Sequence, residues 1–267
     1  MAFFRGVGRS VVVVSAFLLL GPFVGPGWTD KGDLQAIQMF AVSPALFVEN
    51  QGQWPDASVR YVHDGALVDI AVTDCGVRFL ATKRDSNEPE VSRDFGADEL
   101  DLLRRTDKTT RTLQFSVSFV NARQVRPVGL KRSQSLFNYC VGERANWRQN
   151  VPAYEIAAYK GLYEGIDLYV QGLRSHLKYE FHVAPGADYR QIAIRFEGIE
   201  GLSIGEDGSL LVDLGEKWGT IQDDAPYIYQ EIDGRTKPVA GRFILCGELA
   251  YVFEITNDIN PTHPLVI

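Results

Sequence analysis

The stretch Leu113–Val120, with the sequence LQFSVSFV, decides the fold class of this chain. Four apolar side chains alternate in it with polar ones, and they are Leu113, Phe115, Val117 and Phe119. Successive side chains of a β-strand point to opposite faces, so the alternation predicts a strand with one buried and one wet face. We expect these four side chains to be buried and the intervening Gln114, Ser116 and Ser118 to be much less so.

The same two-residue period recurs along most of the chain. In His176–Val183 (HLKYEFHV), four apolar side chains share one face, and two histidines, a lysine and a glutamate share the other. Asp-Gly pairs at 64–65, 207–208 and 233–234 separate such runs, and this dipeptide supplies the positive φ of tight hairpins. Further strands are predicted over Val59–His63, Leu67–Thr73, Val77–Thr82, Ile166–Val170, Ile192–Phe196, Ser209–Leu214, Tyr227–Ile232, Gly241–Leu245 and Ala250–Ile255.

These patterns predict an all-β fold of antiparallel, sandwich-type sheets with little helix. No long helices separate the strands, as the crossovers of a parallel sheet would require. Asp94–Arg105 is the one plausible helix, inside a polar stretch at 83–110 that looks like an insertion, and Ala187–Gln191 adds a single turn. We divide the chain into a signal peptide (1–27), a tether (28–45), an N-terminal β subdomain (46–135) and a C-terminal β-sandwich subdomain (136–267).

The first 27 residues have the pattern of a secretory signal peptide. Arg5 and Arg9 precede the apolar run Val11–Leu20, and glycines and prolines follow it. Ten apolar residues make a helix about 15 Å long, half the thickness of a bilayer core, so the run predicts export and not a membrane span. We therefore expect a secreted or cell-surface protein from which the first 20–30 residues are removed. The cleavage site stays open.

The charge of the chain argues against a nucleic-acid partner. The 267 residues carry a net charge of −7, whereas nucleic-acid binding requires a concentrated basic footprint. The closest candidate is RQVRPVGLKR at 123–132, and four cations spread over such a stretch more often decorate an exposed strand and turn. These cations are Arg123, Arg126, Lys131 and Arg132.

Three cysteines, Cys75, Cys140 and Cys246, are an odd number for an exported protein. We expect buried, reduced thiols, and the alternative is one disulfide of unknown pairing that leaves a single thiol. A metal site is disfavoured, because no two cysteines are close in sequence and no histidine adjoins them.

Two patterns suggest chemistry, but each has a simpler structural explanation. Gly201–Gly205 (GLSIG) spells the G-x-S-x-G elbow of a hydrolase, with Asp223 or Asp258 and then His263 downstream. An elbow serine needs a helix after it, and an Asp-Gly hairpin follows Ser203 instead. The second pattern is His176 and His182, which lie about 20 Å apart along one strand, too far to share an ion.

Carboxylates are plentiful, but their sequence positions fit turns better than catalysis. Paired catalytic carboxylates must converge in space, and no pattern in the sequence shows that they do. The D-x-[DN]-x-[DN]-G calcium loop is also missing. We therefore assign no catalytic residue, metal ligand or cofactor, and an incidental calcium ion stays open. The carboxylates considered are Asp167, Glu206, Asp207, Asp223 and Asp224.

Two tryptophans stand beside side-chain amides and form the candidate ligand site. Trp54 follows Gln53 in NQGQW, and Trp147 follows Asn146 in NWRQN. Sugar-binding sites stack aromatic rings on pyranose faces and use amides for the hydroxyl groups. The same residues can equally fix the loops, with tryptophan covering the core and the amides bonding loose backbone.

Five segments together resemble a domain of unknown function found in secreted bacterial and archaeal proteins, usually ahead of seven-bladed β-propeller (SBBP) repeats. The resemblance covers roughly residues 46–267. It implies a secreted, all-β, non-catalytic module, although Cys140 stands where an aromatic or aliphatic residue is expected. The segments are Phe47–Pro55 (FVENQGQWP), Asn138–Tyr154 (NYCVGERANWRQNVPAY), Tyr163–Gly172 (YEGIDLYVQG), Leu177–Gly198 (LKYEFHVAPGADYRQIAIRFEG) and Ala225–Leu245 (APYIYQEIDGRTKPVAGRFIL).

Two functions follow as hypotheses. The first is a secreted, non-catalytic module of a cell-surface or extracellular protein, structural or binding a glycan or protein in adhesion. The second is an extracellular polysaccharide hydrolase that uses paired carboxylates. Geometry distinguishes them, because only the enzyme needs two carboxylates at catalytic separation beside an aromatic cleft.

Overall fold

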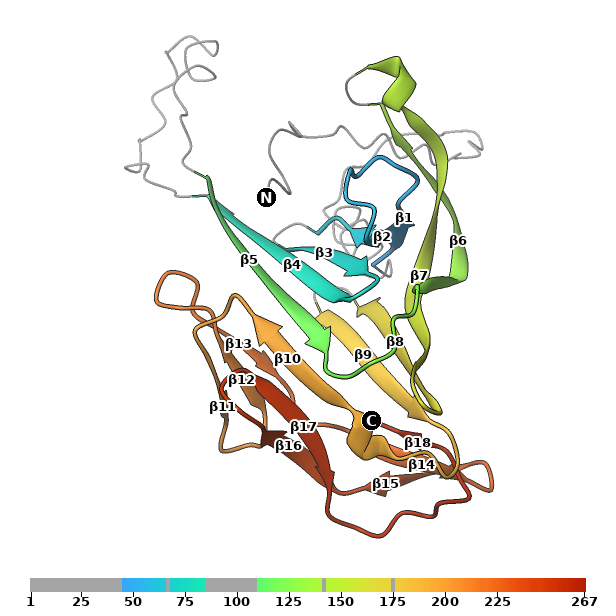
Figure 1. The fold of residues 1–267 in the computed structure, drawn as a ribbon, viewed down its shortest axis with the longest axis vertical. Coiled ribbons are helices and arrows are strands. Elements are labelled where there is room, and N and C mark those ends of the chain that lie inside the picture. Colours follow the sequence, from blue (N-terminus) through green and yellow to red (C-terminus); the bar gives the residue numbers. More distant parts are fainter. Residues whose placement is uncertain (1–44, 66–67, 85–109, 141–142, 174–175) are drawn as a thin grey trace, which may run out of the picture.

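The structure, a computed structural model, describes residues 45–65, 68–84, 110–140, 143–173 and 176–267 (Figure 1). Its regular elements are antiparallel strands, with two single 3₁₀ turns, and they confirm the all-β prediction. Fifteen strands form one large sheet and three form a small one. The signal peptide, nearly all of the tether and the helix expected at 94–105 lie outside the described residues.

The first five strands form an antiparallel meander, because each is followed by a short connection or by the polar stretch at 85–109. Glycine is required at position 65 because the backbone passes too close for a side chain. A Cβ there would lie 2.1 Å from the carbonyl oxygen of Val68. The other two Asp-Gly pairs have the expected positive φ at glycine, 83° at Gly208 and 71° at Gly234. The strands are β1 (Phe47–Glu49), β2 (Val59–His63), β3 (Val68–Thr73), β4 (Gly76–Arg84) and β5 (Thr110–Phe119).

The longest strand, β7 (Arg148–Tyr163), joins the parts of the large sheet. One edge of it pairs with β6 (Val128–Tyr139), and the other edge pairs first with β1 and then with β8 (Ile166–Leu173). The expected division at residues 135/136 falls within β6. It stays a prediction, because strand pairing alone does not define independently folding units.

The large sheet curls so that its two ends approach each other (Figure 1). From β8 it continues through β9, β18 and β14 to β15, and from β5 through β10 and β17 to β16. A Cβ on Gly241 of β16 would lie 2.5 Å from the side chain of Ile228 in β14, so the ends touch. The bounds are β9 (His176–Val183), β10 (Ala193–Glu197), β14 (Ile228–Ile232), β15 (Arg235–Val239), β16 (Gly241–Leu245), β17 (Ala250–Ile255) and β18 (Leu265–Val266).

The curl encloses an aromatic core. Phe181 of β9 is fully buried, and its ring lies within 6.4 Å, centroid to centroid, of those of Phe119, Tyr179 and Phe253. The small sheet contributes Leu210 and Val212 to the same core. The small sheet consists of β11 (Gly201–Ile204), β12 (Leu210–Asp213) and β13 (Thr220–Asp223). The turn expected after Pro185 is present as the 3₁₀ turn η2 (Tyr189–Gln191).

In β5 the faces are oriented as the LQFSVSFV pattern predicts, but burial is less sharply divided. Phe115 is buried and stacks on Phe79, whereas the other three apolar side chains are half-buried against the core. Gln114 is exposed, and the two serines are half-buried. Because β5 has a neighbour on both edges, β4 and β10, even its polar face is partly covered.

The expectation of buried thiols is wrong. Cys75, Cys140 and Cys246 are all exposed, and none forms a disulfide. Cys75 lies in the β3–β4 turn, and the other two directly follow β6 and β16. These are positions where the chain leaves the sheet, so the thiols point away from the core.

No helical segment of the described residues could serve as a transmembrane span.

Candidate functional site

The NQGQW loop after β1 is held by its own amides. The Asn50 Nδ2 donates to the carbonyl oxygens of Trp54, Asp56 and Val59 at 3.0–3.3 Å, and its Oδ1 accepts from the N–H groups of Gly52 and Trp54. Gln53, in the same loop, donates to the carbonyl oxygen of Glu49 at 2.6 Å. These hydrogen bonds satisfy loop backbone, so the amides act here in the structural sense.

The two tryptophan motifs meet, but they do not form a shared aromatic platform. The Arg148 Nε donates to the carbonyl oxygen of Gln51 at 2.7 Å and so joins the two loops. Trp54 is half-buried with its ring edge-on to Tyr139, at 5.2 Å between centroids. Trp147 is 37% exposed under the Arg144 guanidinium, and Asn146 is exposed in the 3₁₀ turn η1 (Arg144–Asn146).

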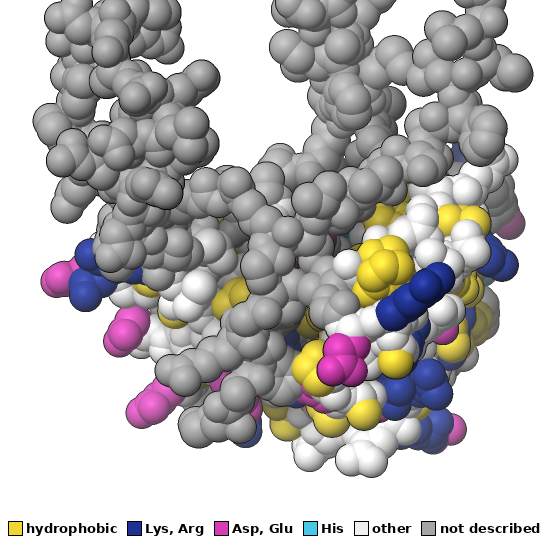
Figure 2. Space-filling model, turned by 90° about the horizontal axis from the view of Figure 1, so that it is seen from above, with side chains coloured by type: hydrophobic (Ala, Val, Ile, Leu, Met, Phe, Trp, Pro, Cys, Tyr) yellow, Lys and Arg dark blue, Asp and Glu magenta, His cyan; other side chains and the backbone are white. Residues whose placement is uncertain are grey.

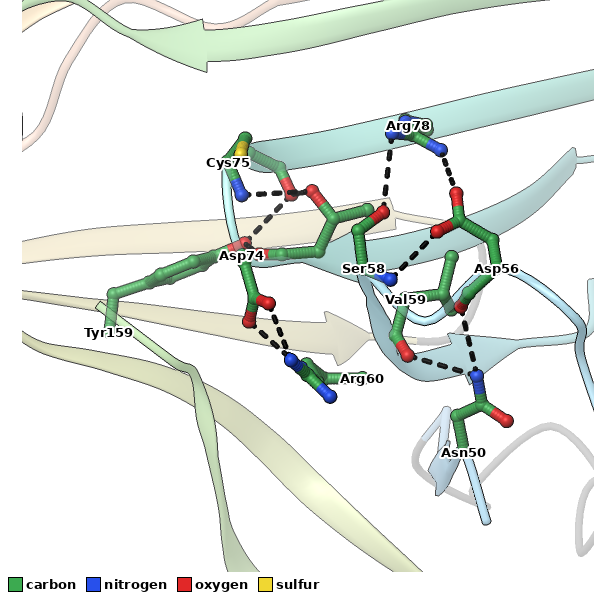
Figure 3. A network of polar contacts seen from close by, with 11 residues as sticks. Asn50, Asp56, Ser58, Val59, Arg60, Asp74, Cys75, Arg78 and Tyr159 are labelled. Atoms are coloured by element: carbon green, nitrogen blue, oxygen red, sulfur yellow. Dashed lines mark hydrogen bonds and ion pairs between the residues drawn. The ribbon is translucent and has the colours of Figure 1, made fainter. Parts of the chain in front are cut away.

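Figure 3 shows a network of polar contacts that links residues of the N-terminal meander to one another and to Tyr159 of β7. Arg60 forms a two-pronged ion pair with Asp74, at 2.8 and 2.6 Å, and Arg78 pairs with Asp56 at 2.8 Å. The hydroxyl of Tyr159 lies 2.8 Å from the carbonyl oxygens of both Thr73 and Gly76. Burial raises the pKa of Tyr159 far above its ordinary value, so this hydroxyl stays a neutral donor.

The G-x-S-x-G match is a hairpin, as its sequence context indicates. Ser203 is exposed in β11, and β12 follows after a turn in which the Gly205 N–H donates to the carbonyl oxygen of Ser209. Asp223 accepts a hydrogen bond from Tyr179, and the His263 ring lies against Thr262. The strand–turn–helix that an elbow serine needs is therefore not formed at Ser203.

We expect Ser203→Ala to change the free energy of unfolding by less than about 0.5 kcal/mol, because the side chain is exposed. Urea denaturation of both proteins checks the value. The reading is contradicted if Ser203 is labelled by a fluorophosphonate, or if an esterase activity of the parent disappears in the variant.

Most of the carboxylates considered in the sequence form hydrogen bonds or ion pairs that stabilise the fold. Asp207 accepts from the backbone and hydroxyl of Ser209 in the β11–β12 turn. Asp223 is half-buried, and burial raises its pKa despite the hydrogen bond from Tyr179. The Tyr179 hydroxyl lies 3.0 Å from that of Tyr251 in β17, so this cluster ties the small sheet to the large one.

A carboxylate pair that sequence reasoning missed lies near Trp54 and Tyr139. Asp69 in β3 accepts the Gly65 N–H at 3.1 Å, and Asp64 stands beside it in the β2–β3 connection. Burial, followed by the charge of Asp64, raises the pKa of Asp69 to about 6. Burial first, and then Asp64, also raises the pKa of Tyr139 to about 12.

We expect Asp69→Asn to stabilise the protein at pH 7 by about 1–2 kcal/mol, after allowance for partial exposure. A carboxyl whose folded pKa is raised favours folding below its unfolded pKa, near 3.8, and that advantage is lost as pH rises to about 6. The gain should therefore appear between pH 4 and 6 and vanish below pH 4. Urea denaturation across this range measures it, and Asp64→Asn should give a smaller gain over the same range, because it removes only the neighbouring charge that contributes to the raised pKa of Asp69. An equal gain at pH 3.5 and pH 7 would contradict the assignment.

Four aromatic rings, one exposed and three half-buried, lie on the outer face of β8, β9 and β14. Tyr227 is 66% exposed, and its ring lies 5.6 Å from that of Tyr229. On the neighbouring strands, the rings of Tyr169 and His182 lie 4.4 Å apart. We call these four side chains the outer aromatic surface.

Strand register places two of these rings, Tyr229 and His182, in line. Tyr229 pairs with Val266, which pairs with His182, which pairs with Asp167, and directly opposed residues point to the same face. Two strand spacings therefore separate Tyr229 from His182, about 10 Å. The apolar partners on the opposite face, such as Ile228 and Phe181, are buried, and their packing fixes which face these rings occupy.

Most charges around these rings are neutralised locally. Lys160 pairs with Asp167 at 2.8 Å, with its ammonium 4.2 Å from the Tyr169 ring centre, and Lys178 pairs with Glu180 at 2.7 Å. Burial opposes ionisation of Glu180, but its bonds to Lys178 and His182 hold its pKa below the ordinary value. Lys160, Asp167, Lys178 and Glu180 thus neutralise one another, and Glu231 adds an exposed carboxylate next to Tyr229.

Sequence reasoning placed His182, Lys178 and Glu180 on the outer face of their strand but did not connect them to the tyrosines. The available signal was Tyr227-Ile228-Tyr229, in which two aromatic side chains occupy the wet face of an alternating strand. Of the other histidines, His63 contacts the carbonyl oxygen of Leu46, and His176 is the first residue of β9. Among the described residues, no three His, Cys, Asp or Glu side chains converge as a metal site.

Fold and surface together define an antiparallel all-β module with an exposed aromatic face. Residues 47–267 match the model of a domain of unknown function, DUF7948, and the chain belongs to that family. Searches of curated proteins and of solved structures found no match.

Proposed function

We propose that this protein is a secreted, non-catalytic module of the cell surface or extracellular space, and that its outer aromatic surface binds a glycan or a protein. The observation that carries the proposal is the exposed ring of Tyr227 beside Tyr229, which strand register places in line with His182. Tyrosine supplies a large contact area at low entropic cost and has a hydroxyl for hydrogen bonding. The ion pairs Lys160–Asp167 and Lys178–Glu180 beside these rings favour a ligand of low charge, such as an uncharged polysaccharide.

Export and context belong to the same proposal. The basic start, the ten-residue apolar run and the Gly/Pro break at 1–27 support secretion. The resemblance to domains that precede SBBP propeller repeats supports a role as one module of a larger surface protein. N-terminal sequencing of the exported protein tests the first point, and recovery of intact Met1 from cytoplasm alone would contradict it.

We expect Tyr227→Ala and Tyr229→Ala each to weaken ligand binding about tenfold or more, because exposed aromatic anchors dominate such interfaces. Affinity electrophoresis against neutral polysaccharides, such as soluble cellulose and chitin derivatives, measures the change. Trp147→Ala is the control, since it removes an exposed aromatic ring from the other candidate site. Loss of binding in Trp147→Ala alone would move the site to the two tryptophan loops.

The alternative function, a polysaccharide hydrolase, is favoured by one observation, the Asp64–Asp69 pair near Tyr139. Burial and the neighbouring Asp64 raise the pKa of Asp69, and a carboxyl with a raised pKa suits a general acid. This alternative requires release of reducing ends from a polysaccharide by the parent protein. It also requires that both Asp64→Asn and Asp69→Asn abolish that release while the fold is retained.

A further inference from the structure

A long two-stranded ribbon concentrates basic charge in this otherwise acidic protein. Residues 126–150 contain five cations and one carboxylate, a net charge of +4 in a chain of −7. In Figure 1 the ribbon of β6 and the start of β7 rises from the large sheet to the turn η1. We call Arg126, Lys131, Arg132 and Arg144, together with this ribbon, the basic arm.

The cations of the basic arm differ from most other described cations in that they form no ion pair with a described residue. Elsewhere, Arg60, Arg78, Lys160, Lys178 and Arg242 each form an ion pair at 2.6–2.8 Å. The four cations of the basic arm have no ion-pair partner within the described part of the chain. All four are exposed, so their charge is available to a partner.

Large apolar side chains accompany these cations. Val128 is 41% exposed, Leu136 42% and Trp147 37%, and all three lie on the ribbon or at its tip. In Figure 2 basic and hydrophobic side chains adjoin one another on the side where the basic arm lies in Figure 1. β6 is an edge strand, and its lysine and its bulges are features that prevent an edge from pairing with another chain. Exposed Val, Leu and Trp side chains have the opposite effect, so protection of the edge does not explain them.

We propose that the basic arm docks the protein on an anionic membrane surface. Lysine and arginine attract anionic phospholipid headgroups, while tryptophan and leucine enter the boundary between headgroups and acyl chains. A soluble polyanion would use the cations but has no place for the apolar side chains. The acidic remainder of the chain is repelled by the same surface, so the protein approaches with the basic arm first.

Co-sedimentation of the full chain with vesicles tests the proposal. We expect binding to phosphatidylglycerol/phosphatidylcholine vesicles at low salt, little binding to phosphatidylcholine alone, and release at 0.5 M salt, as screening requires. Arg126→Gln/Arg132→Gln/Arg144→Gln should weaken binding by more than about tenfold. Its matched control is Lys217→Gln/Arg235→Gln/Lys237→Gln, which removes three exposed cations elsewhere and should bind like the parent.

A single apolar change separates a membrane from a soluble polyanion. Leu136→Ser should weaken vesicle binding several-fold, whereas Ile221→Ser, at an equally exposed position on β13, should not. The proposal is overturned if the parent ignores the vesicles, or if both triple variants lose binding equally. It is also overturned if the protein binds polygalacturonate and not vesicles, with no effect of Leu136→Ser. Near-ultraviolet circular dichroism confirms that each variant is folded.

Discussion

Phe181→Ala should lower the free energy of unfolding by about 3–5 kcal/mol, the largest effect expected of a single substitution in this protein. Phe181 is fully buried, and three other aromatic rings from β5, β9 and β17 surround it. Removing the ring leaves a cavity whose walls belong to strands fixed on both sides, so the site cannot collapse to fill it. Urea denaturation followed by tryptophan fluorescence measures the loss.

Phe181→Leu is the matched control, because it keeps an apolar side chain and should cost less than about 1.5–2 kcal/mol. A cost below 1 kcal/mol for Phe181→Ala would show that the sheet does not close around this ring.

Asn50→Ala should lower the free energy of unfolding by about 2–4 kcal/mol, because one side-chain amide, with two N–H donors and one oxygen, contacts five backbone groups of the loop and of β2. Alanine leaves three carbonyl oxygens and two N–H groups without this partner. Asn50→Asp keeps the acceptor and loses the donor, so it should fall between alanine and the parent. Differential scanning calorimetry or urea denaturation checks the order.

Asn146→Ala is the control for this prediction, since Asn146 is an exposed amide in the other motif and its loss should cost less than about 0.5 kcal/mol. If Asn50→Ala kept full stability but abolished ligand binding, the NQGQW loop would be a binding loop and not a structural one.

The fold class was predictable because local alternation carries it. In β5 and β9, inward and outward side chains follow the two-residue period, and their strands lie where that period predicts. The longest strand, β7, was missed because its run VPAYEIAA does not alternate: Val151, Pro152 and Ala153 are all buried. Curling of the sheet was also beyond local patterns, because it depends on β5 meeting β10 and on contact between Ile228 and Gly241.

The candidate site shows a similar limit. A sequence in which tryptophan adjoins Asn or Gln is the same for a sugar-binding site and for a loop held by its own side chains. The two differ in whether the amide groups point to solvent or to backbone. Asn50 and Gln53 point to backbone of their own loop. The outer aromatic surface was missed because its rings come from three strands, and only register brings Tyr229 in line with His182. Likewise, Asp64 and Asp69 become a pair only when the β2–β3 connection forms.

The central position of β7 has a consequence for how the chain reaches its native state. Phe47 pairs with Tyr154, and Phe119 pairs with Ile194, so strands near the N-terminus pair with strands that are distant in sequence. A high contact order of this kind slows folding, because loop-closure entropy must be overcome before the pairing is rewarded. We expect refolding in seconds or slower. During that time unpaired strand edges are open to aggregation, so dilute conditions should raise the yield of native protein.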